Sequence, residues 1–279
     1  MEPEQPPAQD AKQPDDLTPL KEPAFATALN DLDDLLTQSG KAFLIGAGCS
    51  KCAGLPLMAE LTAKTLASKK LSPTTTTILS AIQGLFSGAI VANIEDYLSE
   101  LVDLVAIAKR RNVLGANSHT VAIAGHDYTA EQLEDAVDEI KAAIAEEIDV
   151  RVSMEVHWKF IRAIHRPSRP GRTVAARPVD YLILNYDTLI ESALALQKLR
   201  YADGMNGGNS AWWDMSTFEA KVLSARVIKL HGSIDWTEMS GESLPRRIDR
   251  NLRLPPGNDQ KVLIWPASTK YRETLRDPY

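Results

Sequence analysis

Residues able to bind a phosphate group and move a proton occur at three places in this chain, each directly after a short apolar run. The first is Gly46-Ala-Gly-Cys-Ser50, the second is Asn185-Tyr-Asp187 and the third is His231-Gly-Ser233. Glycines let backbone N–H groups approach an anion closely, and an amide can orient a water or a hydroxyl. A neutral imidazole can accept a proton near neutral pH. Together the three segments indicate acid–base chemistry beside a bound phosphate.

The apolar runs before these segments are predicted to be parallel β-strands, over 41–45, 179–184 and 227–230. In an open parallel sheet, ligands bind in the crevice outside the carboxyl ends of the strands. The three polar segments should therefore face one cleft. A fourth strand is predicted over 262–265, before Pro266. We expect an α/β fold with a Rossmann-like parallel sheet and helices on both faces.

Helices should connect these strands, apart from residues 1–20, whose Pro-, Gln- and Asp-rich composition predicts a disordered tail. Residues 21–279 should form the folded domain. Helices are predicted over 25–38, ending at Gly40, and over 57–68. Residues 74–166 should form a helical insertion, in which 129–132 is a capping box followed by an apolar stripe at helical spacing: Leu133, Ala136, Val137, Ile140, Ile144 and Ile148. A second capping box at 188–191 should open a helix reaching Leu199, after a loop over 167–178.

Composition limits the class of protein. The chain has 279 residues and a net charge of −6, which disfavours nucleic-acid binding by the domain as a whole. It has no apolar run of about 20 residues, no typical signal peptide and few cysteines, so a cytoplasmic location is expected. Cys49 and Cys52 cannot complete a four-thiolate zinc site, and they interrupt a glycine-rich turn, which disfavours both redox and metal roles.

Each segment also has a structural alternative. Lys51 stands where a dinucleotide fingerprint has its third glycine, so the Gly-x-Gly segment could be a tight turn without a ligand. No P-loop sequence is present. Asp187 suits a helix N-cap as well as a site. Trp212 and Trp213, beside 206–209, could cover the cleft, but ordinary loop packing is the preferred interpretation.

Read together, the three segments resemble the sirtuin superfamily. The segment from Gly46 to Pro56 is similar to the family's Gly-Ala-Gly-x-Ser-x-x-x-Gly-Ile-Pro loop, 184–187 to its Gln-Asn-Ile-Asp segment and 229–233 to its catalytic His-Gly segment. The resemblance implies NAD contacts at Gly46, Ala47, Gly48 and Ser50, a ribose contact at Asn185, a nicotinamide-side carboxylate at Asp187 and a general base at His231.

Departures from the family pattern favour one subclass. Leu57-Met-Ala59 replaces the Asp-Phe-Arg of sirtuin deacylases, and the four zinc-binding cysteines after the catalytic histidine are missing. Instead, 93–98 in the insertion and 262–279 are similar to bacterial sirtuin-like NAD hydrolases; the roles of Glu95 and Asp96 stay open. In such proteins further strands and a Gly-x-Ser loop hold the adenosine end, so a chain ending at Tyr279 is expected to be a fragment.

The resemblance implies an NAD+ hydrolase that releases nicotinamide and ADP-ribose, with NAD as substrate and no metal. It implies an NAD-depleting effector of abortive-infection antiviral defence, acting as an oligomer beside a DNA-translocating ATPase, an Argonaute-type protein or a phage-sensing module. Two alternatives remain open. One is an NAD-dependent protein deacylase or ADP-ribosyltransferase, and the other is a non-catalytic module that binds NAD or ADP-ribose.

Overall fold

The computed structural model describes residues 21–38, 40–86, 88, 91–115, 119–166, 177–249, 252 and 260–263. The predicted tail over 1–20, most of the predicted loop over 167–178 and the segment from 264 to Tyr279 lie outside the described residues.

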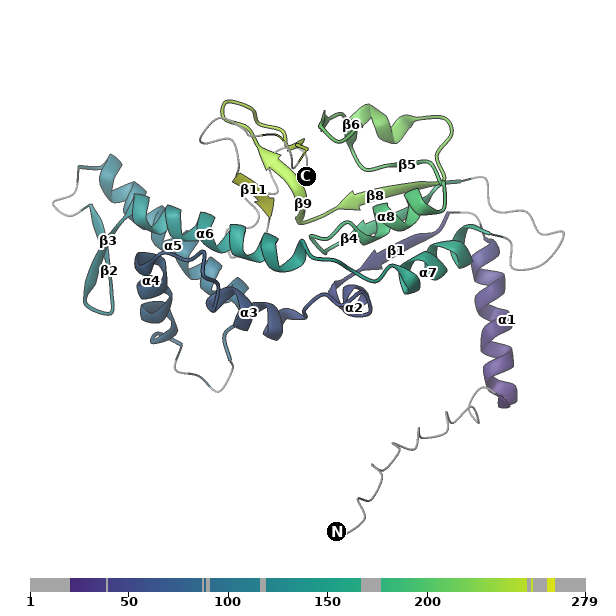
Figure 1. Cartoon of the computed structure of the whole chain (residues 1–279), viewed down its shortest axis with the longest axis horizontal. Coiled ribbons are helices and arrows are strands. Elements are labelled where there is room, and N and C mark those ends of the chain that lie inside the picture. The colour runs from purple at the N-terminus through teal and green to yellow at the C-terminus, as the bar shows by residue number, and fades with distance from the viewer. Residues whose placement is uncertain are drawn as a thin grey trace, which may run out of the picture.

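A four-stranded parallel sheet forms one half of the molecule (Figure 1). Its order is β1 (Ala42–Ile45), β4 (Val179–Ile183), β8 (Ala225–Lys229) and β5 (Tyr201–Ala202). Ile45 lies opposite Ile183, which in turn lies opposite Lys229, so three strands end at the same level. The Rossmann-like α/β prediction is confirmed. The two-residue strand β5 was not predicted.

One face of this sheet packs on helices α7 (Glu155–His165) and α8 (Leu189–Leu196). Alternate strand residues point into this core, which contains Ile45, Ile161, Ile164, Val179, Tyr181, Ile183, Ile190, Ala193, Leu194, Ala225 and Val227. The strand predicted over 41–45 is β1, which is buried on one face only, because it is the edge strand and Leu44 is 69% exposed.

A second apolar core is built mainly from α3 (Met58–Leu66) together with three helices of the predicted insertion: α4 (Pro73–Gln83), α5 (Ile94–Val113) and α6 (Ala130–Ile148). The predicted capping box at the start of α6 is present, and all six residues of its apolar stripe are buried. The prediction of nearly continuous helix is wrong at one place, where β2 (Thr120–Ile123) and β3 (His126–Thr129) form a hairpin. Its two turn residues have positive φ, which suits a hairpin turn and excludes a helix.

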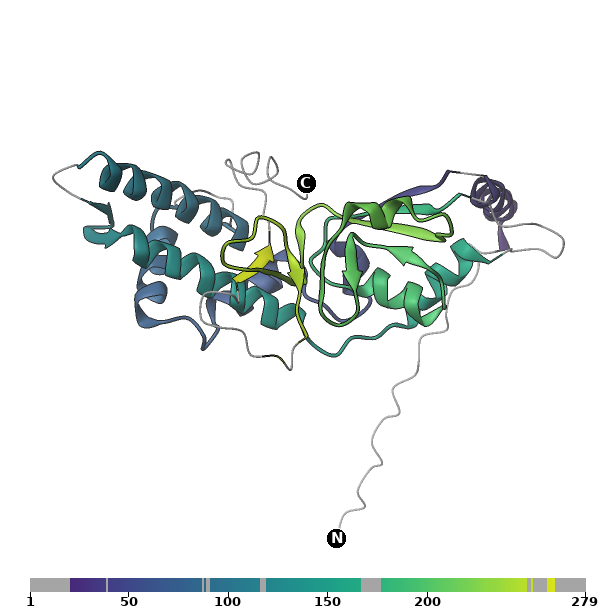
Figure 2. The ribbon, with the colours of Figure 1, turned by 90° about the horizontal axis from the view of Figure 1, so that it is seen from above.

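A second sheet lies between the insertion and the parallel sheet (Figure 2). It has the order β11 (Gln260–Leu263), β9 (Gly232–Glu238), β10 (Arg246–Arg247), β7 (Ala211–Trp213) and β6 (Met205–Gly207), and neighbours are antiparallel. The strand predicted near 262 therefore belongs to this sheet rather than to the parallel one. Trp213 packs edge-on against Trp236 at 5.6 Å and fills the space beside Gly204, which supports the packing interpretation for this tryptophan.

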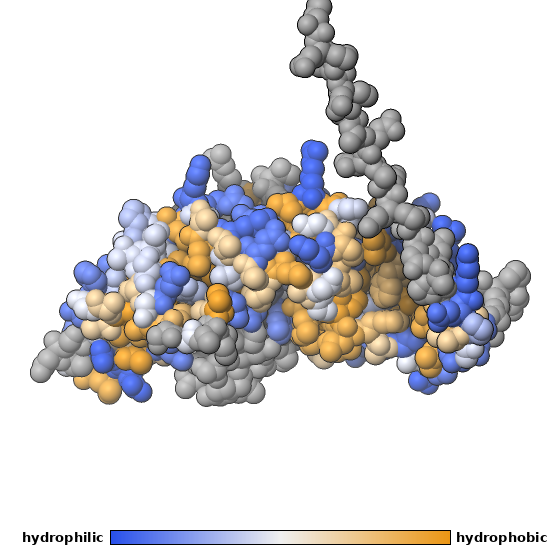
Figure 3. All heavy atoms as spheres, turned by 90° about the horizontal axis from the view of Figure 1, so that it is seen from below, coloured by the Kyte–Doolittle hydropathy of each residue, from blue (hydrophilic) through white to orange (hydrophobic). Residues whose placement is uncertain are grey.

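Three further helices are α1 (Pro23–Thr37), α2 (Ala47–Lys51) directly after β1, and the 3-10 helix η2 (Met215–Glu219). Helix α1 extends away from the sheet (Figure 1), and its Leu29, Leu32 and Leu35 are half exposed. Apolar patches alternate with polar ones on the face seen from below (Figure 3). Within the described ranges, no helix has the length and apolar character needed to cross a bilayer.

Candidate functional site

The glycine segment after β1 folds into the short helix α2, with Gly46 as its N-cap. Neither Gly46 nor Gly48 has a positive φ, and a Cβ added at either position would meet no atom within 4 Å. Packing within the chain therefore does not require glycine at these two positions. The space above them is open, as close approach of a ligand to the backbone would require.

The three strand ends line a single cavity of about 240 Å³. Gly46, Ala47 and Ser50 come from the segment after β1, Asn185 and Asp187 from the segment after β4, and His231 from the segment after β8. Among the predicted site residues only Gly48 is not part of the lining; it is exposed on the outer side of α2. The convergence expected from the sheet topology is thus present.

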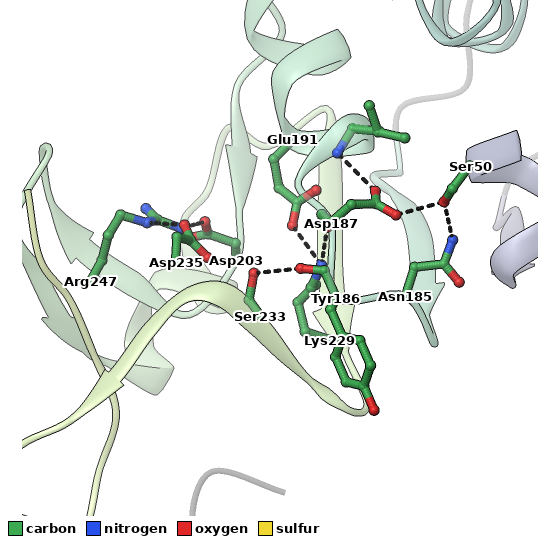
Figure 4. Close-up of polar contacts among 11 residues, drawn as sticks. Ser50, Asn185, Tyr186, Asp187, Glu191, Asp203, Lys229, Ser233, Asp235 and Arg247 are labelled. Carbon is green, nitrogen blue, oxygen red and sulfur yellow. Dashed lines mark hydrogen bonds and ion pairs between the residues drawn. The ribbon is translucent and has the colours of Figure 1, made fainter. Parts of the chain in front are cut away.

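Asn185, Ser50 and Asp187 form a hydrogen-bonded chain along one side of the cavity (Figure 4). Asn185 Nδ2 donates to the carbonyl oxygen of Gly46 at 3.0 Å and to Ser50 Oγ at 2.6 Å. Ser50 Oγ in turn donates to Asp187 Oδ2 at 2.6 Å. Both hydrogens of the amide are used in this way, so Asn185 has its carbonyl oxygen left as an acceptor for a hydroxyl or a water.

Asp187 both caps a helix and lines the cavity. Its carboxylate is buried, and Oδ1 accepts the N–H of Leu189 at the start of α8 at 3.1 Å. The capping box predicted at 188–191 is wrong, because the Thr188 side chain makes no capping bond and Glu191 is paired with Lys229 instead. The serine that holds Asn185 is therefore itself held by a carboxylate fixed to a helix.

His231 is positioned by the turn between β8 and β9. Gly232 adopts a φ of +77°, which a glycine tolerates and most residues do not, and this turns the chain directly after the histidine. The N–H groups of Leu230 and Ile234 bond to the carbonyls of Ile183 and Tyr186, both at 2.9 Å. Because these carbonyls belong to β4 and the segment after it, the same backbone contacts place His231 beside Asn185.

The rest of the cavity wall is mostly apolar and was not predicted. It comes from α3 and its approach, from α6 and from the segment after β4, and it contains Leu55, Pro56, Met58, Leu61, Ile148, Leu184 and Tyr186. The tyrosine ring lies 6.5 Å from the imidazole of His231. Apolar walls with a few polar groups are typical of small-molecule sites.

Glu95 also lines the cavity, at the first turn of α5. Asn93 Oδ1 accepts the N–H of Glu95 at 2.8 Å, and Asp96 Oδ2 accepts the N–H of Asn93 at 2.8 Å. Asp96 is therefore part of the helix cap, whereas Glu95 faces the cavity. The similarity of 93–98 to NAD hydrolases was the one sequence signal for this residue.

A cluster of buried and partly buried charges lies beside Asp187, on the side away from Ser50 (Figure 4). Lys229 donates to the backbone carbonyl of Asp187 and lies 3.5 Å from Glu191, whose pKa is raised by burial to about 7. Further along, Arg247 pairs with Asp203 at 2.5 Å and with Asp235 at 2.6 Å. Sequence analysis missed these five residues, and the one available signal was a lysine inside an apolar strand.

No group of three or more potential metal ligands occurs in the part of the chain that the structure describes. Comparison with known proteins does not supply an identity. No protein-family model matches the chain, and no curated protein matches it significantly.

Proposed function

We propose that this chain is an NAD+ glycohydrolase that cleaves the nicotinamide–ribose bond. The observation that carries the proposal is the convergence of an open glycine segment, an oriented amide and an imidazole on one cavity. The resemblance of the same three segments to sirtuins supplies the identity of the nucleotide. This resemblance and the geometry are independent, because the resemblance rests on residue types and the convergence on the sheet topology.

The size of the cavity indicates which part of the dinucleotide it would hold. Pockets for drug-sized ligands measure about 300–1,000 Å³, and this cavity is smaller, at about 240 Å³. We assign it to the nicotinamide and its ribose. The pyrophosphate would then lie at the glycine segment, against Gly46 and Ala47, where added atoms meet open space.

In the proposed reaction the bond between ribose C1′ and the nicotinamide nitrogen breaks, and its electron pair leaves with nicotinamide. A water oxygen then bonds to C1′ and loses its proton to His231, giving ADP-ribose. Asn185 accepts a hydrogen bond from the water or from a ribose hydroxyl through its free carbonyl oxygen. General-base assistance of this kind contributes about 10²–10⁴-fold to the rate.

The direct test is nicotinamide release from NAD, followed by chromatography. His231→Ala and Asn185→Ala should each lower release by about 10²-fold or more, with unchanged circular dichroism. Matched controls are His126→Ala in β3 and Asn112→Ala in α5, both at exposed positions outside the cavity, and both should keep wild-type rates. Wild-type rates in both site variants would remove these residues from the mechanism.

The same assay distinguishes the alternative functions. Nicotinamide release that depends on an added acyl-lysine peptide or on a protein acceptor would identify a deacylase or an ADP-ribosyltransferase. Heat of NAD binding in a calorimeter without nicotinamide release would identify a regulatory module. Release from NAD and water alone, with ADP-ribose as co-product, is the result that we expect.

The resemblance to bacterial NAD hydrolases extends the proposal to a biological role. We assign the chain to NAD depletion in antiviral defence, as an oligomer that works with a partner such as a DNA-translocating ATPase, an Argonaute-type protein or a phage-sensing module. Nicotinamide release should rise when the chain is co-expressed with the protein encoded next to it. The role would be contradicted if nicotinamide release were the same with and without the neighbouring protein, both before and after infection.

A further inference from the structure

The two cysteines lie together on the short helix beside the cavity. Cys49 is inside α2, and Cys52 is the residue that ends it. The sequence indicated a glycine-rich turn at this point, which disfavoured a redox role; the structure instead has the short helix α2 here, directly after a strand. Residues three apart on a helix have Cβ atoms about 5–6 Å apart, near the range that a disulfide spans. Cys52 Sγ also folds back toward Cys49, donating to its carbonyl oxygen at 3.0 Å.

The two thiols have different surroundings. Cys52 is exposed, whereas Cys49 is half-buried, with Sγ 3.6 Å from Nε2 of His157 in α7. His157 is only 1% exposed, and its other ring nitrogen has no partner. Burial lowers the pKa of His157 and raises the pKa of the Cys49 thiol, so both groups favour their neutral forms. A neutral imidazole beside the thiol has a lone pair that can take the thiol proton as the sulfur attacks. One thiol can thus meet a reagent in solution while the other has a base beside it.

We propose that Cys49 and Cys52 are a reversible disulfide site in the helix that borders the cavity, with small-molecule disulfides as the oxidant. The Cys52 thiolate attacks one sulfur of the oxidant, releases one thiol and forms a mixed disulfide. Cys49 then gives its proton to His157 and attacks the Cys52 sulfur, and the second thiol leaves with that proton. Two protein thiols and one oxidant disulfide become one protein disulfide and two small thiols.

Closing this disulfide must change the shape of α2. The Cβ atoms of a disulfide lie about 3.8 Å apart, closer than the about 5–6 Å of an unlinked pair at this spacing. The residues enclosed by the link include Ser50, which holds Asn185 and is held by Asp187. Oxidation therefore acts on the residue that orients the amide. This consequence for NAD rests on the proposed function, whereas the disulfide itself does not.

The first experiment follows the thiols directly. The protein is incubated with oxidised glutathione, quenched with a maleimide and weighed intact. Wild type should lose both reactive thiols and carry no glutathione, whereas Cys49→Ser should retain glutathione on Cys52. His157→Gln should form the internal disulfide about tenfold or more slowly. Stable glutathione adducts on wild type, at the level of Cys49→Ser, would overturn the proposal.

The second experiment measures the consequence for α2. Amide hydrogen exchange over 46–54 should change on oxidation, and dithiothreitol should restore the original exchange rates. The affinity for NAD should fall by about tenfold in the oxidised protein, which is the size of effect expected from losing one hydrogen bond to a charged group. Cys52→Ser should bind NAD like reduced wild type and should not respond to oxidant. Identical hydrogen exchange in both redox states would refute the claim that the disulfide changes the conformation of α2. Failure of reduced protein to bind NAD would reject the proposed function alone, because the exchange and the thiol masses do not depend on it.

Discussion

Two clusters of polar side chains lie at the same end of the parallel sheet and differ in the number of charged residues that they contain. The amide network, made of Ser50, Asn185 and Asp187, carries one formal charge and opens onto the cavity. The ion cluster contains the other five residues: Glu191, Asp203, Lys229, Asp235 and Arg247. None of these five lines the cavity.

The difference indicates that one cluster holds the strand ends in place, whereas the other presents a polar atom to the cavity. Burying charges is costly unless they are paired, so a cluster of paired charges holds its members in one arrangement. The amide network keeps an uncharged acceptor oriented toward the cavity. Lys229 connects the two, because it pairs with Glu191 and also donates to the backbone carbonyl of Asp187. We therefore expect the ion cluster to determine stability and the amide network to determine activity.

The largest effect on stability should come from Lys229→Met. The change leaves Glu191 without its cation and the Asp187 carbonyl without its donor, and breaking a buried pair in this way costs about 3–5 kcal/mol. Urea denaturation followed by circular dichroism measures the loss. The matched control is Lys159→Met, which breaks an exposed pair with Glu155 and should cost less than about 1 kcal/mol. Equal costs for the two variants would contradict the structural role of the ion cluster.

Glu191 should make stability depend on pH. Burial raises the pKa of its carboxyl group to about 7 in the folded chain, above the 4.5 of an exposed glutamate. The folded state therefore keeps a proton that the unfolded state has lost. Stability from this group is therefore present at low pH and falls as the pH rises through about 7. Between about pH 5.5 and 7.5 the loss should be about 2 kcal/mol. Glu191→Gln should remove this part of the pH dependence in urea denaturation, and an unchanged slope would mean that another group titrates.

The parts of the fold that sequence analysis predicted have local signals. Apolar runs that end in Gly-x-Gly, Asn-x-Asp and His-Gly marked three of the four parallel strands, and the 129–132 capping box marked the start of α6. The strands β5, β6, β7 and β10 have only two or three residues each, too few to give a periodic signal in the sequence. The β2–β3 hairpin was missed because its turn residues, Ala124 and Gly125, interrupt a region whose composition favours helix.

In the candidate site, too, the residues with a local sequence signal were predicted and the others were not. Gly46, Ser50, Asn185, Asp187 and His231 were predicted, because each follows an apolar run that ends at the same edge of the sheet. The apolar wall and the ion cluster could not be predicted, since they bring together side chains that are far apart in sequence. Lys229 and Glu191 are 38 positions apart, and only the crossover between β4, α8 and β8 places them in contact.

Ser50→Ala should lower activity and stability together, because it acts on the amide network itself. It leaves Asp187 Oδ2 without its donor and removes one of the two acceptors of Asn185 Nδ2, which should cost about 1–2 kcal/mol of unfolding free energy. Nicotinamide release should fall by about tenfold, because the amide loses an anchor. The control, Ser80→Ala, removes an exposed hydroxyl bonded within α4 and should change neither quantity. Full activity in Ser50→Ala would show that Asn185 is held by Gly46 alone.

The smallest effect should come from Thr129→Ala, which tests whether stability and activity are independent far from both polar clusters. Thr129 Oγ1 accepts the N–H of Gln132 at 3.2 Å, and Gln132 Oε1 accepts the N–H of Thr129 at 3.0 Å. Loss of such a cap costs about 1 kcal/mol. Because neither residue lines the cavity, nicotinamide release at low temperature should be unchanged while the urea midpoint falls. A parallel loss of activity would mean that α6 transmits changes at its far end to Ile148 in the cavity wall.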